Sequence, residues 1–514
     1  MRLVGVRHEQ TAVYAADGYA RVGGKLGVAA TTSGPGAANA LGATGEANEA
    51  GSPVLIIATD IATCLRRDGV HRGVLHETRD QGAMFAPVVK RVVRVRSGQS
   101  LGAAVRLAAG IALAPPTGPV YLEIPTDLLG APEPNFDVAE DDPDSRRDQR
   151  QPRAAEISAA VKLIETSKRP VIWVGGGAVK AGAGPPISKL AERLAAPVFE
   201  TYTARGILPT GHPCRIGLPP HQPQAGDIWD DADLVIAVGT DFDGMMTQNW
   251  AMPQPPTMVA INIDPSEAGK NYDADLALIG DARSIAGELA AAVGVRPGLT
   301  ELNRRLADLR NAVNREIAEA HPEEWSFLES LEQALSDDTI VFADMCIPGY
   351  WTAAFHPFEG PRRLAYPVGW GTLGFAFPAS LGAALSRPDP VLCICGDGGF
   401  LFAAGELATM AQEQIPLTLL IVDDGGYGML RYDQKVMGQR SVGVDLVSPD
   451  WHHLAAAFGL PLTKVESLGP PLAEALEQEL SNPVPSILLA SASLTPPVTT
   501  SPRWYRSVIE KEKS

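Results

Sequence analysis

The stretch VLCICGDGGFLFAAGELATMAQEQIPLTLLIVDDGGYGMLR, residues 391–431, decides the fold of this chain. Its first apolar run, Val391 to Cys395, predicts a buried strand that ends at the glycine turn 396–399. A helix is expected over 402–414, and a second buried strand over 417–422 runs into an acidic glycine turn. Adjacent parallel strands would bring Asp397 and Asp424 to one carboxyl edge of a sheet, where open α/β folds bind ligands.

Asp397 and Asp424 are candidate ligands for a divalent cation that holds a phosphate. Mg²⁺ binds few protein carboxylates and completes its octahedron with phosphate oxygens and water. The backbone amides of Gly396, Gly398 and Gly399, at a helix start, favour anionic oxygen. Each turn alone is more simply interpreted as a chain reversal, but both turns together favour the cation site.

This pair of turns resembles the signature of thiamine diphosphate-dependent enzymes, in which G-D-G is followed at a similar distance by N-N. Here the second half reads Asp423-Asp424, and an Asp oxygen serves magnesium as well as an Asn oxygen. The resemblance implies that Asp397, Asp424 and the main-chain carbonyl of Gly426 bind Mg²⁺. The metal would in turn hold the diphosphate of thiamine diphosphate.

Length and composition indicate a large globular protein. The 514 residues suggest about three domains, and 45% hydrophobic with 20% charged residues is ordinary for a globular chain. The formal net charge of −17, without a basic stripe, argues against a nucleic-acid partner. The five cysteines lack metal-ligand spacing. With no signal-peptide pattern and no apolar run of ~18 residues, we expect a cytoplasmic protein without a membrane partner.

Three units of alternating strands and helices follow one another along the chain. This alternation of strands and helices predicts the α/β fold class, with three consecutive Rossmann-like or flavodoxin-like domains that contain parallel sheets. The family resemblance implies pyrimidine-binding, central and diphosphate-binding roles in that order. We expect the domains at 1–130, 154–298 and 326–495, a linker at 131–153, a helical connector at 299–325 and a tail at 496–514.

The first unit is expected to open with a short strand over residues 3–6 that leads to Glu9 and a helix. A glutamate at this point is ordinarily a helix-start charge. The family places there the glutamate that binds the aminopyrimidine ring, so the resemblance implies a catalytic Glu9. A buried Glu9 with a raised pKa would suit that proton transfer. Family members have a strand and a helix before this glutamate; here either the start codon is misplaced or the sheet lacks an edge element.

Two glycine-rich segments resemble further parts of the family's cofactor site. Ser33-Gly34-Pro35-Gly36-Ala37-Ala38-Asn39 matches S-G-P-G-x-x-N, which implies that Pro35 and Asn39 lie beside the pyrimidine. In the segment 369–375 the carbonyl of Gly371 would meet the aminopyrimidine, and Leu373 would wedge the cofactor into its bent shape. Met429 would line the same pocket. Without the resemblance, both segments would be interpreted as helix-start turns.

Other features are less decisive. In the family the N-terminal domain of one subunit faces the C-terminal domain of another, which implies a homodimer or homotetramer. Gly175-Gly176-Gly177 follows a strand and is either a structural turn or a dinucleotide cradle. An FAD in the central domain is therefore left open, by analogy with acetolactate synthase. His452-His453 is interpreted as a surface or capping pair.

The overall resemblance is closest to the acetolactate synthase-like group, and it implies decarboxylation of a small-molecule 2-oxo acid followed by carboligation. A simple decarboxylase is the alternative, because Arg431-Tyr432-Asp433-Gln434 replaces the Arg-x-Trp-Gln segment whose Trp shapes the acceptor pocket. The segment 344–349 also departs from the synthases' G-Q-H-Q, and residues 76–78 depart from their Phe-Gln-Glu. A catalytically impaired homologue or regulatory subunit is a second alternative, motivated by the elements missing before Glu9.

Overall fold

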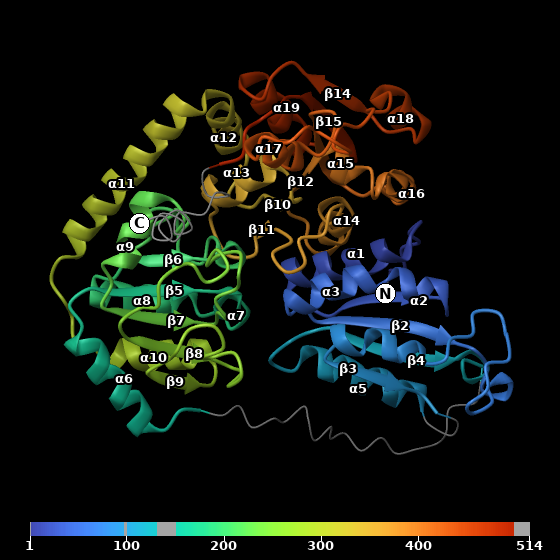
Figure 1. Ribbon diagram of the computed structural model, residues 1–514, viewed down its shortest axis with the longest axis horizontal. Helices are drawn as coiled ribbons and strands as arrows, with labels where there is room; N and C mark the ends of the chain where they lie inside the picture. The colour runs from blue at the N-terminus through green and yellow to red at the C-terminus, as the bar shows by residue number, and fades with distance from the viewer. Residues whose placement is uncertain (1, 97–99, 131–150, 498–514) are drawn as a thin grey trace.

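Three all-parallel β-sheets, each covered by helices, make up the protein (Figure 1). The computed structural model describes residues 2–96, 100–130 and 151–497. This architecture confirms the predicted α/β fold class. The exact domain boundaries remain predictions, and the expected linker 131–153 and tail 496–514 lie mostly outside the described residues.

The N-terminal domain contains a four-stranded sheet with the order β1-β2-β4-β3. Its strands are β1 (Gly27–Thr31), β2 (Val54–Asp60), β3 (Arg91–Arg94) and β4 (Val120–Pro125). The helices around it are α1 (Glu9–Gly23), α2 (Pro35–Asn39), α3 (Leu41–Glu49), α4 (Gln81–Phe85) and α5 (Leu101–Leu113). β2 and β4 are almost wholly buried, as expected for central parallel strands with both faces covered.

The central domain contains a five-stranded sheet with the order β6-β5-β7-β8-β9. Its strands are β5 (Pro170–Val174), β6 (Val198–Glu200), β7 (Leu234–Val238), β8 (Met258–Asn262) and β9 (Leu276–Ile279). Its helices are α6 (Ala154–Thr166), α7 (Gly176–Lys180), α8 (Gly184–Leu194), α9 (Pro223–Asp230) and α10 (Ala282–Ala292). The long helix α11 (Leu299–Ala320) connects this domain to the next one, as Figure 1 shows.

The C-terminal domain contains a six-stranded sheet with the order β11-β10-β12-β13-β15-β14. Its strands are β10 (Ile340–Ala343), β11 (Leu364–Ala365), β12 (Val391–Gly396), β13 (Thr418–Asp423), β14 (Leu462–Val465) and β15 (Ser486–Ser491). Its helices are α12 (Pro322–Ala334), α13 (Ile347–Phe355), α14 (Ala376–Ser386), α15 (Asp397–Phe400), α16 (Leu407–Gln412), α17 (Gly428–Val436), α18 (Trp451–Ala457) and α19 (Pro470–Leu480). The pairing of Gly396 with Val422 ends β12 and β13 at the same level.

Helices α1 and α14 join the N-terminal and C-terminal domains and lie side by side in Figure 1. A Cβ atom on Gly18 would lie 2.0 Å from the carbonyl oxygen of Ala379, and one on Gly382 would lie 1.8 Å from that of Ala15. Only glycine allows the two helices to approach this closely. Buried residues from both domains, on either side of this contact, form one continuous hydrophobic cluster.

Two expectations about local structure are wrong. Residues 3–6 form no strand: they are irregular and Leu3 is 85% exposed, because no neighbouring strand lies beside them to pair with. The helix expected over 402–414 is broken, with α15 starting at Asp397 and α16 starting only at Leu407. A turn of 3-10 helix, Ala404–Glu406, lies between them around a glycine, which weakens continuous helix.

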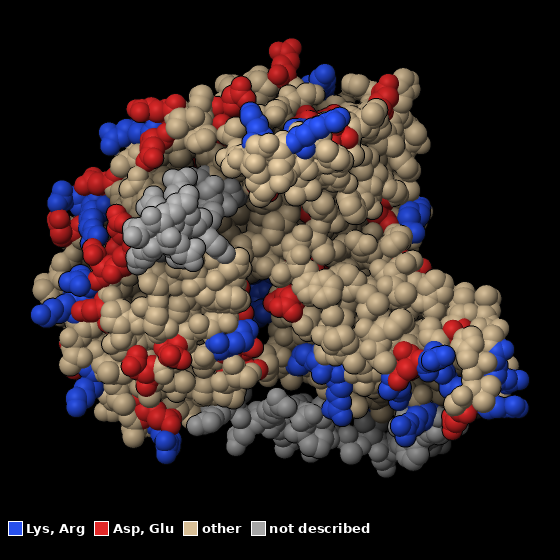
Figure 2. All heavy atoms as spheres, viewed as in Figure 1, with Lys and Arg blue, Asp and Glu red and all other residues tan. Residues whose placement is uncertain are grey.

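The surface displays both signs of charge. On the face shown in Figure 2, acidic and basic side chains are interspersed, and the surface is hollowed between the central and N-terminal domains. Within the described ranges, no helix is both long enough and apolar enough to cross a membrane.

Candidate active site

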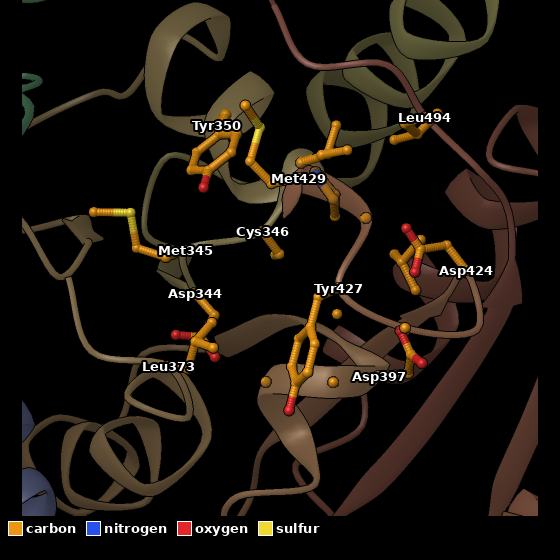
Figure 3. A pocket seen from close by; sticks show the side chains of 18 of the residues that line it. Asp344, Met345, Cys346, Tyr350, Leu373, Asp397, Asp424, Tyr427, Met429 and Leu494 are labelled. Atoms are coloured by element: carbon orange, nitrogen blue, oxygen red, sulfur yellow. The ribbon is translucent and has the colours of Figure 1, made fainter. Parts of the chain in front are cut away.

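The carboxyl ends of β12 and β13 open into a pocket of the C-terminal domain (Figure 3). Asp397 follows β12 directly and Asp424 follows β13, so the parallel register places both carboxylates at one end of this pocket. The structure brings together here nine of the predicted site residues: Gly371, Leu373, Gly396, Asp397, Gly398, Gly399, Asp424, Gly426 and Met429. Their individual roles remain predictions.

The carboxylate of Asp397 is fully buried and unneutralised. Neither of its oxygens has a hydrogen-bond partner in the described structure, and Oδ1 of Asp424 also lacks one. Burial, and then the nearby charges of Asp424 and Asp423, raise the pKa of Asp397 to about 6. Burial likewise raises the pKa of Asp424, although Arg431 lies 3.8 Å away. Buried acceptor oxygens without donors are costly unless a cation binds between them.

The donor set fits Mg²⁺ and a diphosphate. Two carboxylates and a main-chain carbonyl suit an ion that keeps several sites for phosphate and water. Among the residues described, no group of three or more His, Cys, Asp or Glu side chains forms a closed metal cage. Gly428 and Gly398 leave room for neighbouring side chains of the site. A Cβ on Gly428 would lie 2.0 Å from Oδ2 of Asp424, and one on Gly398 would lie 2.8 Å from the ring of Tyr427.

Asp344 is a pocket residue whose role sequence reasoning missed. It is fully buried at the end of β10, and its Oδ2 accepts a hydrogen bond of 2.9 Å from the backbone N–H of Gly374. This bond fixes the turn that carries Gly371 and Leu373. Burial raises the pKa of Asp344 to about 6. The available signal was an acidic residue directly after an apolar strand, the same signal that identified Asp397 and Asp424.

Glu9 belongs to a second cluster, in the N-terminal domain. It starts α1, and its Oε2 accepts a hydrogen bond of 3.0 Å from Nδ2 of Asn39. Pro35 starts the neighbouring α2, and a Cβ on Gly36 would lie 3.2 Å from Oε1 of Glu9. Glu9 is only partly buried, and the hydrogen bond from Asn39 lowers its pKa below the ordinary value.

Gln81 supports this second cluster and was also missed. Its buried side chain accepts a hydrogen bond of 2.6 Å from the backbone N–H of Gly34 and donates one to the hydroxyl of Tyr121. Gly34 has φ +62°, a conformation that glycine adopts readily, and Gln81 fixes this turn just before Pro35. None of the residues lining the pocket of Figure 3 comes from the N-terminal domain. Within one chain, the cluster around Glu9 and the pocket of the C-terminal domain therefore share no lining residue.

The remaining motifs have structural explanations. A Cβ on Gly175 or Gly177 would collide with the backbone of Gly239, so these glycines allow two loops of the central domain to pack. His452 and His453 are exposed at the start of α18, in agreement with the surface interpretation, and the capping residue is Asp450, whose side chain accepts from the backbone N–H of His453. Cys393 and Cys395 are buried, unbridged packing residues.

The fold and the site define a cofactor-dependent α/β enzyme of three domains, and comparison with known proteins identifies its family. Residues 1–84, 157–289 and 345–489 match the N-terminal TPP binding, central and C-terminal TPP binding domains of the thiamine pyrophosphate enzymes. The chain belongs to this family, and to its acetolactate synthase-like group.

Two relatives illustrate the range of this group. The chain is 33% identical to a probable 2-ketoarginine decarboxylase of Pseudomonas aeruginosa over 478 residues, which cover 91% of this chain and 83% of the relative. It is 31% identical to a probable acetolactate synthase large subunit of Methanocaldococcus jannaschii over 483 residues, 90% of this chain and 80% of the relative. The family membership thus establishes a thiamine diphosphate-dependent enzyme.

Proposed function

We propose that the protein decarboxylates a 2-oxo acid with thiamine diphosphate and Mg²⁺, and then joins the product to a second carbonyl compound. The buried, partnerless carboxylate of Asp397 beside Asp424 is the observation that carries this proposal. When bound, thiamine diphosphate supplies the carbon nucleophile and electron sink that decarboxylation requires.

Different residues of the pocket would bind the metal, contact the phosphates and shield the cofactor from water. Asp397, Asp424 and the carbonyl of Gly426 would hold Mg²⁺ and thereby anchor the diphosphate. The backbones of Gly396, Gly398 and Gly399 would approach the phosphate oxygens. Leu373 and Met429 line the pocket and would exclude water from the part of it where the reaction takes place.

Glu9 would hold and move the proton at the aminopyrimidine. Its hydrogen bond to Asn39 stabilises the ionised carboxylate, so Glu9 can accept a proton at neutral pH. Glu9 does not line the pocket of its own chain. We therefore propose a homodimer or homotetramer in which Glu9, Pro35 and Asn39 of one subunit face the pocket of another.

The surface beside the pocket supports such an assembly. α17 and the loop after it expose large apolar side chains: Leu430, Val436, Met437, Val442 and Val447. An apolar surface of this kind favours contact with another protein surface. Packing against Gly239 explains Gly175 and Gly177, so these glycines are no evidence for FAD in the central domain. A reducing cytoplasm fits the five unbridged cysteines.

Simple decarboxylation is the second candidate. Asp433, on α17, stands where the synthases have the Trp that shapes the acceptor pocket, and one relative is described as a decarboxylase. The two candidates share the decarboxylation step and differ only in whether the product is protonated or joined to a carbonyl.

The experiment is incubation of purified protein with pyruvate, thiamine diphosphate and Mg²⁺, with carbon dioxide and acetolactate measured in parallel. Acetolactate in proportion to carbon dioxide supports carboligation, and carbon dioxide alone supports the simple decarboxylase. Titration calorimetry accompanies the assay. Failure to bind thiamine diphosphate would overturn both candidates in favour of a catalytically impaired homologue.

A further inference from the structure

Asp433 lies one helical turn beyond a wall of the pocket. Met429 and Leu430 on α17 line the pocket, and residues four apart share one face of a helix, so Asp433 follows Met429 along the pocket side. Tyr350 lines the pocket from α13, and burial raises the pKa of its hydroxyl, with smaller contributions from nearby charges that include Asp433. Asp433 is therefore close to the mouth of the site.

The carboxylate of Asp433 has no counter-ion. In the described part of the chain no side chain forms a hydrogen bond or an ion pair with it, although it is partly buried. Its neighbours one turn away on either side are apolar: Met429, Leu430, Val436 and Met437. The nearby Arg431 binds instead the carbonyls of Asp424 and Gly425 and the carboxylate of Asp445. Burial in these surroundings raises the pKa of Asp433.

A partly buried charge among apolar groups is unfavourable unless a ligand neutralises it. The pocket lining contains no Lys, Arg or His, so this chain offers nothing there to bind a second carboxylate on a substrate. Mg²⁺ would neutralise Asp397 and Asp424, whereas Asp433 lies one helical turn further along α17 than the pocket-lining Met429. A positive group at the far end of the substrate would complement it.

We propose that Asp433 selects 2-oxo acids whose side chain ends in a positively charged group, such as a guanidinium. This inference rests on the proposed function and names the substrate class of the same site. The cation would form a charge-assisted hydrogen bond with Asp433 while the 2-oxo acid end meets the cofactor. The apolar stretch between them, formed by Met429 and Leu430, would contact the methylene groups of the substrate.

The test uses the full-length protein loaded with thiamine diphosphate and Mg²⁺ and measures initial rates of carbon dioxide release. Three acids differ in the charge at the far end: 2-oxo-5-guanidinopentanoate, neutral 2-oxohexanoate and anionic 2-oxoglutarate. We expect the highest kcat/KM for the guanidino acid. Asp433→Asn should lower that value roughly 10- to 100-fold, as loss of a charge-assisted hydrogen bond does, and change the value for 2-oxohexanoate less than about twofold.

Two further variants sharpen the result. Glu474→Gln, on the exposed side of α19, removes a charge outside the pocket and should leave all three values unchanged. Asp433→Lys should shift the preference towards 2-oxoglutarate. Equal use of the neutral and guanidino acids, with a ratio that Asp433→Asn does not alter, would overturn the inference and leave the proposed function standing. No carbon dioxide from any of the three acids or from pyruvate would overturn the proposed function as well.

Discussion

The carboxylate of Glu406 in the C-terminal domain accepts a hydrogen bond of 2.9 Å from the backbone N–H of His8, the residue that directly precedes Glu9. The same oxygen accepts a second bond, of 3.0 Å, from Arg7, and Thr409 donates to the other oxygen. Glu406 is almost fully buried. The irregular segment before α1, in place of the expected strand, is thus held by another domain, and Glu9 is held with it.

Glu406→Ala should therefore impair catalysis through the position of Glu9. It leaves two backbone N–H groups without their acceptor, at a cost of about 1–3 kcal/mol each if they stay buried. We expect kcat to fall roughly 10-fold or more, with little change in KM, because misplacement of a catalytic group acts on the chemical step. Glu406→Gln, which retains an acceptor oxygen, should recover part of the loss.

Glu413→Ala is the matched control, since Glu413 binds Arg2 of the same segment at the exposed surface. It should leave kcat within about twofold, because surface ion pairs contribute little. If Glu406→Ala lowered only the melting temperature and left kcat per bound cofactor intact, Glu406 would be structural and would not position Glu9.

Asp397→Ala should abolish binding of Mg²⁺ and thiamine diphosphate while the fold persists. Removing this buried, partnerless carboxylate would take away a proposed metal ligand but no hydrogen bond of the folded chain. Titration calorimetry should show no cofactor binding, and the thermal transition without cofactor should be unchanged or higher. Cofactor affinity equal to that of the unmodified protein would show that the metal binds elsewhere.

The raised pKa of Asp344 should make the stability of the cofactor-free protein depend on pH. Its folded pKa of about 6 exceeds the ordinary value of about 4, so the folded state binds the extra proton. The resulting stabilisation is fully present below pH 4 and is lost as pH rises through 6. Asp344→Asn should flatten that part of the stability curve, measured by denaturant unfolding at several pH values. An unchanged slope would contradict the raised pKa.

Gly382→Ala should weaken the junction of the N-terminal and C-terminal domains. The new Cβ would lie 1.8 Å from the carbonyl oxygen of Ala15, so α1 and α14 must move apart, at a cost of about 1–3 kcal/mol or more. Gly287→Ala in α10 is the control, since the nearest atom to its Cβ would be 4.0 Å away. The control should be neutral or stabilising. The midpoint temperatures of thermal unfolding of the two variants test this difference.

Sequence patterns were sufficient to predict the sheets and the grouping of Asp397, Asp424 and their glycines, because buried parallel strands appear as continuous apolar runs whose ends meet at one edge. They were insufficient for Asp344 and Gln81, whose importance depends on backbone groups distant in the sequence. The strand predicted at 3–6 failed for the same reason: a strand needs a neighbour, and local pattern does not reveal one. The pKa of Glu9 depended on Asn39, thirty positions away.

Complementation between two inactive variants tests whether the active site is divided between subunits. Glu9→Gln and Asp397→Ala proteins should each be inactive alone, the first still able to bind cofactor. When the two are co-expressed and assembled together, half of the dimers are mixed, and each mixed dimer has one intact site. A divided site should recover about a quarter of the unmodified activity. No recovery in verified mixed dimers would show that Glu9 and Asp397 act within one chain.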